Sequence, residues 1–343
     1  MTLRAPFPYF GGKSTVAPVI WAALGRVDHY IEPFFGSGAV LLARPDPAKL
    51  ETINDADGMV ANVWRALKAD AGGVARHADN PVNEADLHAR HLWLVTRRAD
   101  LTARLMGDPA WFDAQAAGWW IWGASNWIGG GWVSGQGPWR AVNGVFGKAE
   151  VGAEAGAKTA AGVIRQIPKL ANGTGVKRQM PVLSRGHGIQ SGGPPDFDSR
   201  AAWVDAQFAA LGARLAEVRV ACGDWTRVLG PSILTATPGT TGIFLDPPYD
   251  LDRRDAVYAL EAPVAADVGR WCLAHGPNPA LRIVLAGYDG EHNVLEDHGW
   301  RVHAWRAQGG YANQGARRGR DNARAERLWL SPACQLAAQG DLF

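Results

Sequence analysis

Cysteine is scarce in this chain, and long apolar runs are missing. The 343 residues include only three cysteines, Cys222, Cys272 and Cys334, with no Cys-x-x-Cys pair among them. This scarcity argues against a structural zinc site and against a disulfide framework. No stretch approaches the roughly 18 consecutive apolar residues of a membrane-spanning helix. The first residues also lack the apolar core of a signal peptide, so we expect the protein to be cytoplasmic.

Several catalytic signatures are missing as well. The nine histidines show no metal-ligand spacing, and we find no nucleophile elbow and no catalytic triad. We therefore expect no bound metal. The formal net charge is only +2, from 35 basic and 33 acidic residues. A nucleic-acid surface would therefore require a local concentration of Lys and Arg.

The residues that are present indicate an α/β protein. An apolar content of 47% in a chain of this length fits two domains with a sizeable core. Apolar residues at helical spacing predict helices around residues 60–67 and over 204–218, the second capped by Asp198 or Ser199. Between them lie short strand-like runs, so we expect a mostly parallel, doubly wound sheet. The expected strands are Val27–Ile31, Leu50–Ile53, Val218–Cys222, Gly242–Leu245, Leu281–Ala286, Trp300–Trp305 and Arg327–Leu330.

The middle of the chain differs from its two ends. Residues 118–193 contain 18 of the 42 glycines, and residues 111–139 contain seven of the 16 tryptophans. Residues 155–195 carry six basic side chains and no acidic one. We interpret residues 70–198 as an insert within a catalytic domain made of residues 1–69 and 199–332. Residues 333–343 are expected to form a flexible tail.

The strongest local motif is Asp246-Pro-Pro-Tyr249, which follows the apolar run Gly242–Leu245. Active sites of open α/β sheets lie at the carboxyl ends of strands. The motif offers a carboxylate, a rigid carbonyl and an aromatic ring, which together suit a flat heteroaromatic ring with an exocyclic amino group. The alternative interpretation is an ordinary turn after a strand.

A second motif, Glu32-Pro-Phe-Phe-Gly36-Ser-Gly38, follows the first strand and opens a helix. Its glycines let the backbone approach a ligand closely, although a tight turn would also explain them. About 20 residues further on, Asn54-Asp-Ala-Asp57 supplies acidic residues that can accept both hydroxyls of a ribose. The phosphate-binding patterns GxGxxG and GxxxxGK[ST] are absent, so we expect a nucleoside without a pyrophosphate. S-adenosylmethionine fits that description.

These motifs, together with Phe10-Gly-Gly-Lys13, resemble in type and order those of the Dam-like adenine-specific DNA methyltransferases. The resemblance covers roughly residues 6–68 and 199–332. It implies a Rossmann-like methyltransferase sheet with an inserted target-recognition domain, and methyl transfer from S-adenosylmethionine to the amino group of adenine in double-stranded DNA. The target base would be flipped out of the helix, and the methyl group transferred directly, in line. It further implies a nucleoid-associated enzyme of bacterial or phage origin, in restriction-modification or in maintenance methylation.

The resemblance also assigns roles to residues. The catalytic set is Asp246, Pro247, Pro248 and Tyr249, with Tyr249 stacking on the flipped base. The cofactor would be held by Tyr9, Phe10, Lys13, Glu32, Phe34, Gly36, Gly38, Asp55, Asp224, Trp225 and Asp246. Within this set Asp55 would bind the ribose, with Asp57 as the alternative, and Asp224 and Trp225 would hold the adenine of the cofactor.

DNA contacts are expected mainly from the insert. The candidates are Trp122, Trp127 and Trp132 for stacking, and Lys177, Arg178, Arg185, Arg317, Arg318 and Arg320 for phosphate neutralisation. A packing role for each tryptophan and a solvated surface for the basic residues are the alternatives.

The chain ends in Gln339-Gly-Asp-Leu342-Phe343, which resembles the short peptide with which bacterial replication proteins bind the sliding clamp. Leu342 and Phe343 would fill an apolar pocket of the clamp, unless they fold back onto the catalytic domain. Two other functions stay open at this point. One is methylation of RNA adenine or of cytosine, and the other is an inactive methyltransferase fold that only binds DNA.

Overall fold

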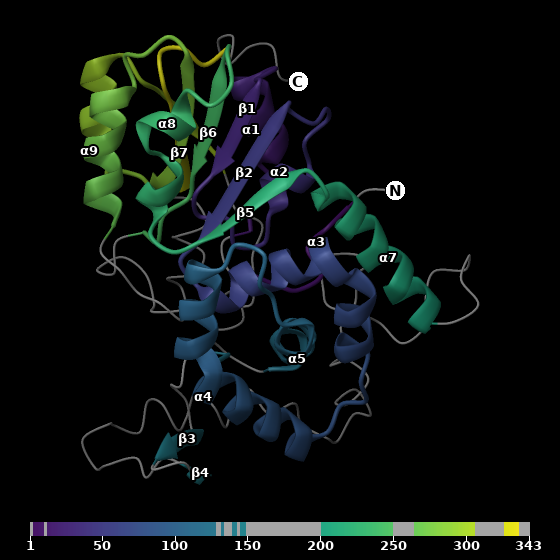
Figure 1. Ribbon diagram of the computed structural model, residues 1–343. Coiled ribbons are helices and arrows are strands. Elements are labelled where there is room, and N and C mark those ends of the chain that lie inside the picture. The colour runs from purple at the N-terminus through teal and green to yellow at the C-terminus, as the bar shows by residue number, and fades with distance from the viewer. Residues whose placement is uncertain are drawn as a thin grey trace, which may run out of the picture.

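The described residues include a seven-stranded sheet, which lies in the upper part of Figure 1. The computed structural model describes residues 3–9, 12–127, 132–133, 139–142, 145–148, 200–249, 264–305 and 326–335. The strand order is β5-β2-β1-β6-β7-β9-β8. All neighbours are parallel except β9, which runs antiparallel to both β7 and β8. The strands are β1 (His29–Glu32), β2 (Leu50–Asp55), β5 (Val218–Cys222), β6 (Thr241–Leu245), β7 (Leu281–Tyr288), β8 (Arg301–Ala304) and β9 (Glu326–Leu330).

The predicted α/β fold class is confirmed. Each strand expected from the sequence is present, with its ends shifted by at most two residues. The mostly parallel order with one antiparallel strand is that of a Rossmann-like methyltransferase sheet. Short apolar runs without polar alternation predicted these strands correctly because strands of a parallel sheet are buried on both faces.

Two apolar clusters cover the two faces of the sheet. Successive residues of a strand point to opposite faces, and Phe244 accordingly belongs to one cluster while Ile243 and Leu245 belong to the other. The first cluster includes the helices α1 (Ala17–Leu24), α3 (Gly58–Ala78), α5 (Ala114–Asn126) and α7 (Arg200–Leu215). The second includes α9 (Ala265–His275) and the short helices η3 (Trp225–Val228) and η4 (Asn293–His298).

Helix α3 connects the sheet to the rest of the molecule. Its apolar stripe at positions 60, 63, 64 and 67 is completely buried, as the spacing predicted. The helix is interrupted at Asp70, which has φ −147° and ψ 66°, and this break falls at the boundary predicted between catalytic domain and insert. Helix α5 approaches α3 closely, since a Cβ at Gly118 would lie 2.7 Å from the carbonyl oxygen of Val74. The division into two domains remains a prediction.

A hairpin and three further helices complete the described part of the fold. A two-stranded hairpin, β3 (Trp139–Val142) with β4 (Val145–Lys148), lies away from the sheet in Figure 1. Helix α4 (Glu84–Gly107) contacts both β3 and the edge strand β5. Two short helices, α2 (Ala39–Leu42) and α8 (Pro231–Leu234), follow β1 and η3 in the chain. None of the helices in the described ranges is long and apolar enough to cross a bilayer.

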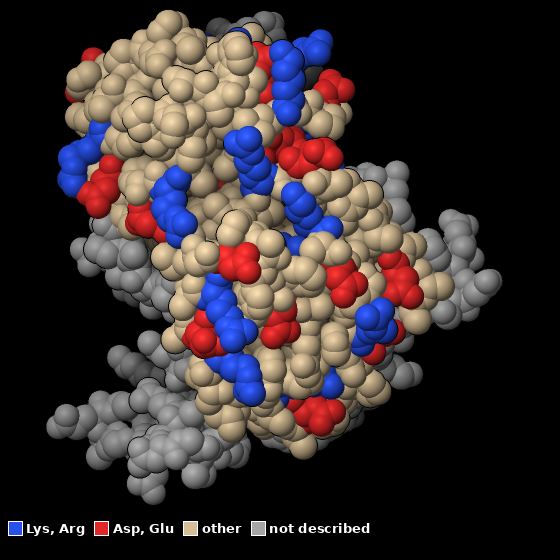
Figure 2. All heavy atoms as spheres, viewed as in Figure 1, with Lys and Arg blue, Asp and Glu red and all other residues tan. Residues whose placement is uncertain are grey.

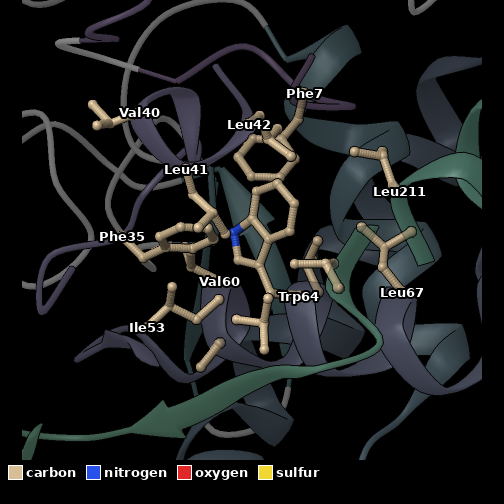
Figure 3. Close-up of a cluster of buried hydrophobic side chains, with 14 of the residues drawn as sticks. Phe7, Phe35, Val40, Leu41, Leu42, Ile53, Val60, Trp64, Leu67 and Leu211 are labelled. Carbon is tan, nitrogen blue, oxygen red and sulfur yellow. The ribbon is translucent and has the colours of Figure 1, made fainter. Parts of the chain in front are cut away.

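Trp64 of α3 anchors the loop that follows β1. The Trp64 indole packs against two phenylalanine rings (Figure 3). Its ring centroid lies 5.0 Å from that of Phe35 and 5.7 Å from that of Phe7. Its Nε1–H donates to the carbonyl oxygen of Gly36 at 2.9 Å. A buried indole with its single donor satisfied is a rigid support. The contact with Trp64 therefore fixes the position of the loop after β1, residues 33–38, which we call the Gly36 loop.

Candidate functional site

A cavity opens at the carboxyl ends of β1, β2, β5 and β6, the edge at which open α/β sheets bind ligands. Glu32 and Asp55 end two of these strands, and Asp246 directly follows a third. The cavity therefore joins segments that lie far apart in the chain. Its lining includes the predicted site residues Tyr9, Lys13, Glu32, Phe34, Gly36, Asp55, Asp224, Trp225, Asp246 and Pro248, as well as Asp57.

The loop after β1 needs glycine at two points. Gly36 and Gly38 have φ values of +48° and +64°, in the left-handed region that other residues adopt only with strain. A Cβ at Gly36 would also lie 2.6 Å from the Tyr9 ring. Gly36 lines the cavity, whereas Gly38 turns the chain into α2.

Asp55 braces this loop and faces the cavity. Its Oδ2 accepts from the backbone N–H of Gly36 at 2.9 Å, and its Oδ1 accepts from the backbone N–H of Asp57 at 2.8 Å. Burial, together with the charge of Asp57, raises the pKa of Asp55 to about 7. An aspartate with this pKa can carry either charge state near neutral pH, which matters for any ligand that requires a carboxylate.

Asp57 is engaged in structural contacts as well. Its Oδ1 caps α3 by accepting from the backbone N–H of Met59 at 2.9 Å, and its Oδ2 lies 2.7 Å from Nη2 of Arg98 in α4. Both oxygens of each aspartate are therefore engaged, those of Asp55 by backbone N–H groups and those of Asp57 by an N-cap and an ion pair. These contacts do not choose between the two residues, and Asp55 stays the predicted partner of a ligand hydroxyl pair. That assignment remains a prediction.

Asn54 ties together two loops that line the cavity, a role that the sequence analysis missed. Its side chain is 1% exposed, and Nδ2 donates to the carbonyl oxygens of Pro33 at 3.0 Å and of Gly223 at 2.9 Å. The only signal in the sequence was its place between a buried strand and Asp55. One amide can satisfy two loop carbonyls only after folding brings β1, β2 and β5 together.

Part of the cavity lining is aromatic. The rings of Phe34 and Trp225 stack with centroids 6.0 Å apart and an interplanar angle of 25°. Asp224 is exposed, and its Oδ1 caps η3 by accepting from the backbone N–H of Thr226 at 3.0 Å. This part of the cavity offers flat apolar surface next to a carboxylate.

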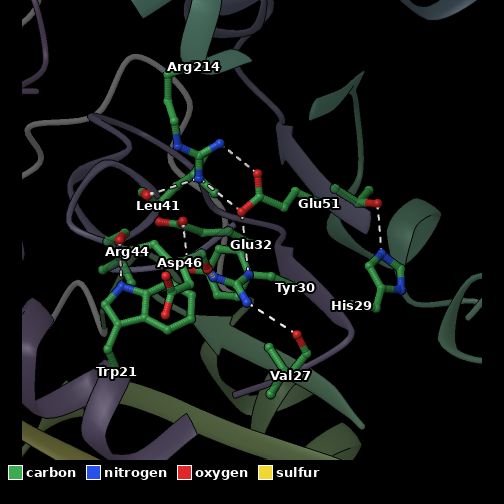
Figure 4. Close-up of polar contacts among 12 residues, drawn as sticks. Trp21, Val27, His29, Tyr30, Glu32, Leu41, Arg44, Asp46, Glu51 and Arg214 are labelled. Atoms are coloured by element: carbon green, nitrogen blue, oxygen red, sulfur yellow. Dashed lines mark hydrogen bonds and ion pairs between the residues drawn. The ribbon is translucent and has the colours of Figure 1, made fainter. Parts of the chain in front are cut away.

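Glu32 is the most deeply buried carboxyl group of the cavity, at 2% exposure. The Tyr30 hydroxyl donates to its Oε2 at 2.8 Å (Figure 4). Burial raises the pKa of Glu32 well above its ordinary value, and the charges of Asp246 and Asp55 add to this effect.

Glu51 and Arg214 nearby form a separate ion pair that joins α7 to the sheet. The distance between Nη1 of Arg214 and Oε2 of Glu51 is 2.6 Å.

Asp246 lies against a buried lysine. Nζ of Lys13 is 3.0 Å from Oδ1 of Asp246, and the Lys13 side chain is 4% exposed. Burial alone would lower the pKa of Lys13, but the neighbouring acidic groups, Asp246 foremost, outweigh it and raise the pKa above its ordinary value. The pair is therefore charged, which keeps Asp246 an acceptor of hydrogen bonds.

Tyr249 is placed differently from the role assigned to it. Its side chain is 8% exposed, its ring edge packs on Tyr288 with centroids 4.6 Å apart, and its hydroxyl contacts Asp246 Oδ1 at 3.1 Å. Pro248 lines the cavity, but Pro247 and Tyr249 do not. Stacking of Tyr249 on a base would require the ring to leave this packing, and it remains a prediction.

The three tryptophans proposed for DNA contact form packing interactions. Trp122 is completely buried, and its indole N–H donates to the carbonyl oxygen of Asn80 at 2.9 Å. Trp127 stacks on His91 with centroids 4.7 Å apart, and the Trp132 indole donates to the carbonyl oxygen of Trp120 at 3.0 Å. The placement of Trp122 corresponds to the packing alternative, whereas Trp127 and Trp132 are partly exposed.

The remaining candidates lie outside the described residues. They are Phe10, Lys177, Arg178, Arg185, Arg317, Arg318, Arg320, Gln339, Leu342 and Phe343. On the described part of the face in Figure 2, Lys and Arg are interspersed with Asp and Glu. Within the described ranges no group of three or more His, Cys, Asp or Glu side chains could hold a metal ion.

Comparison with known proteins gives one family. Residues 9–92 match the family model of the D12 class N6 adenine-specific DNA methyltransferases. A search of the curated proteins found no match. The matched residues include Lys13, the Gly36 loop and Asp55, which line the cavity. Over residues 9–92 the chain is thus similar to the D12 class N6 adenine-specific DNA methyltransferases, which confirms the predicted resemblance to Dam-like adenine methyltransferases.

Proposed function

We propose that the protein transfers a methyl group from S-adenosylmethionine to the exocyclic amino group of adenine at a specific sequence in double-stranded DNA. The family match supports adenine methylation of DNA in general. The observation that carries the full proposal is one cavity lined by Asp55, the Gly36 loop and Asp246. It joins residues suited to a nucleoside cofactor with a carboxylate suited to an amino group.

The side chains of the cavity fit S-adenosylmethionine. Asp55 offers carboxylate oxygens for ribose hydroxyls, and the stacked Phe34 and Trp225 offer a flat surface for adenine. Glu32 and Asp246 also line the cavity, and their acidic side chains can face the positively charged part of the cofactor. When bound, S-adenosylmethionine supplies the methyl group from its positively charged sulfonium. We assign its binding to these residues together with Lys13, Tyr9 and Asp224.

Asp246 and the carbonyl of Pro247 act on the target amino group. The adenine amino nitrogen is a poor nucleophile because its lone pair is delocalised into the ring. Hydrogen bonds accepted by Asp246 and the Pro247 carbonyl localise that lone pair and orient it toward the methyl donor. The Lys13 ammonium lies against this carboxylate as its ion-pair partner. Positioning and fixed charges carry most of such a reaction.

The amino group of a paired adenine is inaccessible inside the duplex, so the base must leave the stack. Unstacking costs a few kcal/mol, and basic side chains of residues 70–198 and of the segment around Arg318 are the expected source of compensating phosphate contacts. The C-terminal Gln339, Leu342 and Phe343 add a second proposed partner, the bacterial sliding clamp. Docking there would bring the enzyme to newly replicated DNA.

Expression of the gene in a methylation-free host, followed by sequencing that detects N6-methyladenine, tests the proposal. The expected result is methylated adenine at one short sequence. Methylated cytosine or methylated RNA would support an alternative substrate instead. Calorimetric titration with S-adenosylmethionine identifies the inactive alternative, because a scaffold without activity should bind the cofactor weakly or not at all.

A further inference from the structure

The hydroxyl group of Tyr249 lies between two carboxyl groups. It is 3.1 Å from Oδ1 of Asp246 and 2.9 Å from Oε2 of Glu326. Glu326 is the first residue of the antiparallel strand β9, where it pairs with Tyr288 of β7, and it is 6% exposed. Neither the motifs nor the resemblance pointed to Glu326, because it lies far along the chain from Asp246-Pro-Pro-Tyr249.

A count of hydrogen atoms assigns the direction of these bonds. A tyrosine hydroxyl has one hydrogen, and an ionised carboxylate has none. Asp246 is the ionised partner because the Lys13 ammonium lies on the same oxygen, at 3.0 Å. The Tyr249 hydrogen therefore points to Asp246, and the hydrogen of the other contact belongs to Glu326. On this assignment, which reverses the usual donation from the Tyr249 hydroxyl to Oε2, Glu326 is a neutral carboxylic acid that donates to Tyr249.

The surroundings of Glu326 agree with a neutral acid. Burial raises its pKa, the charge of Lys13 and the hydrogen bond with Tyr249 oppose this effect, and the charges of Asp246 and Glu291 add to it, so that the pKa of Glu326 is raised on balance. The described titratable and charged groups facing it are Lys13 from the N-terminal segment, Asp246 and Tyr249 from the loop after β6, and Tyr288 and Glu291 from β7 and the turn that follows.

We propose that Glu326 is a positioning residue for methyl transfer, which donates to Tyr249 and so directs the Tyr249 hydroxyl to Asp246. This inference rests on the proposed function. With Lys13 and Tyr249 both on Oδ1, the rotation of the Asp246 carboxylate is fixed, and its second oxygen is presented to the target amino group. A buried acid that only stabilises β9 would have no such link to Asp246.

A double-mutant cycle with Tyr249→Phe and Glu326→Ala separates the two roles. Each single variant should lower the single-turnover rate of methyl transfer to unmethylated duplex DNA at least about tenfold, with the Kd for S-adenosylmethionine changed less than twofold. The double variant should be no slower than the slower single variant, because Glu326 acts only through Tyr249. Rates that fall by the product of the two single effects would overturn the proposal.

Glu326→Gln provides the test that does not depend on a truncated side chain. Its amide N–H can donate to Tyr249, so its rate at pH 7 should stay within about threefold of the wild type. The wild-type rate should fall as the pH rises and Glu326 loses its proton, and the Gln variant should not show that fall. A Gln variant as slow as Glu326→Ala, at an equal melting temperature, would contradict the proposal.

Asp289→Asn is the matched control. Asp289 is a 60% exposed carboxylate that follows β7 and pairs with Arg327, and this variant should have the wild-type rate. The NMR signal of ring-labelled Tyr249, assigned with Tyr249→Phe, should shift in Glu326→Ala and not in Asp289→Asn. If wild type transfers no methyl group, the proposed function is wrong, whereas an unshifted Tyr249 signal overturns the hydrogen bond with Glu326 itself.

Discussion

The ammonium group of Lys13 lies 3.0 Å from Oδ1 of Asp246, with the lysine side chain 4% exposed. This ion pair joins the N-terminal segment to the loop after β6, two parts of the chain that the sequence connects only through motif order. Removal of one partner of a buried ion pair strongly destabilises the folded protein, since the other charge is left without compensation. It also places a positive charge next to the Asp246 carboxylate that the proposed reaction uses.

Replacement of Asp246 by Ala should abolish methyl transfer, with a loss of about 1000-fold or more, because the group that localises the adenine lone pair is gone. Loss of the partner of buried Lys13 should also lower the melting temperature, so both measurements are made where the variant is folded, and there the DNA affinity should remain largely unchanged. Transfer of tritiated methyl groups to duplex DNA measures the first effect, and a gel-shift titration measures the second. An Asp246→Ala enzyme with a near wild-type rate would rule out the mechanism.

Replacement of Asp55 by Ala should raise the KM for S-adenosylmethionine far more than the KM for DNA. The reason is that Asp55 lines the proposed cofactor cavity and would accept the ribose hydroxyls. Steady-state kinetics with each substrate varied in turn measures both constants. Equal changes in the two values would mean that Asp55 only braces the Gly36 loop.

The same residue should make cofactor binding depend on pH. The pKa of Asp55 is raised to about 7, so its ionised fraction increases from about one tenth at pH 6 to about nine tenths at pH 8. If the ribose requires the carboxylate, affinity for S-adenosylmethionine should increase about tenfold over this range. Calorimetry at pH 6, 7 and 8 checks this, and Asp55→Ala should lose the dependence.

Asn54→Ala should lower the free energy of unfolding by about 2 kcal/mol, because the buried carbonyls of Pro33 and Gly223 lose their donor. Cofactor affinity should fall too, since both loops line the cavity. Urea unfolding and calorimetry measure the two effects. Asn278→Ala, at an exposed turn, is the control and should change neither; equal effects would show that Asn54 has no special role.

Neutralisation of Lys177, Arg178 and Arg185 together should weaken DNA binding and flatten its dependence on salt, because fewer counterions are released from the duplex. Fluorescence anisotropy with a labelled duplex, measured between 50 and 200 mM salt, gives the slope. An unchanged slope would assign this segment to ordinary solvated surface.

Truncation after Ala338 should abolish binding to the sliding clamp while methylation of naked DNA continues. The physical reason is that Leu342 and Phe343 would be the apolar anchors of a short docking peptide. A pull-down with purified clamp and a methyl-transfer assay test the two parts. Absence of clamp binding by the full chain, or a lower melting temperature after truncation, would contradict the hypothesis.

Much of the fold could be predicted from local patterns. Apolar runs gave the strands and the stripe on α3, because burial on a sheet or helix face imposes a period that neighbouring residues reveal. The glycines of the Gly36 loop were also readable, since few other residues adopt positive φ. The packing role of Trp122 could not be predicted, because an indole in a Gly-rich segment gives the same sequence pattern whether it stacks on a base or fills a core.

The sequence by itself determined the strand order along the chain, the motifs of the resemblance and the acidic residues at three strand ends. Only the tertiary structure decided which of these residues touch. It placed Lys13 on Asp246, brought Glu326 to Tyr249 and let Asn54 join two loops. The physical reason is that such contacts depend on strand order in space, which long-range packing sets and local periodicity does not record.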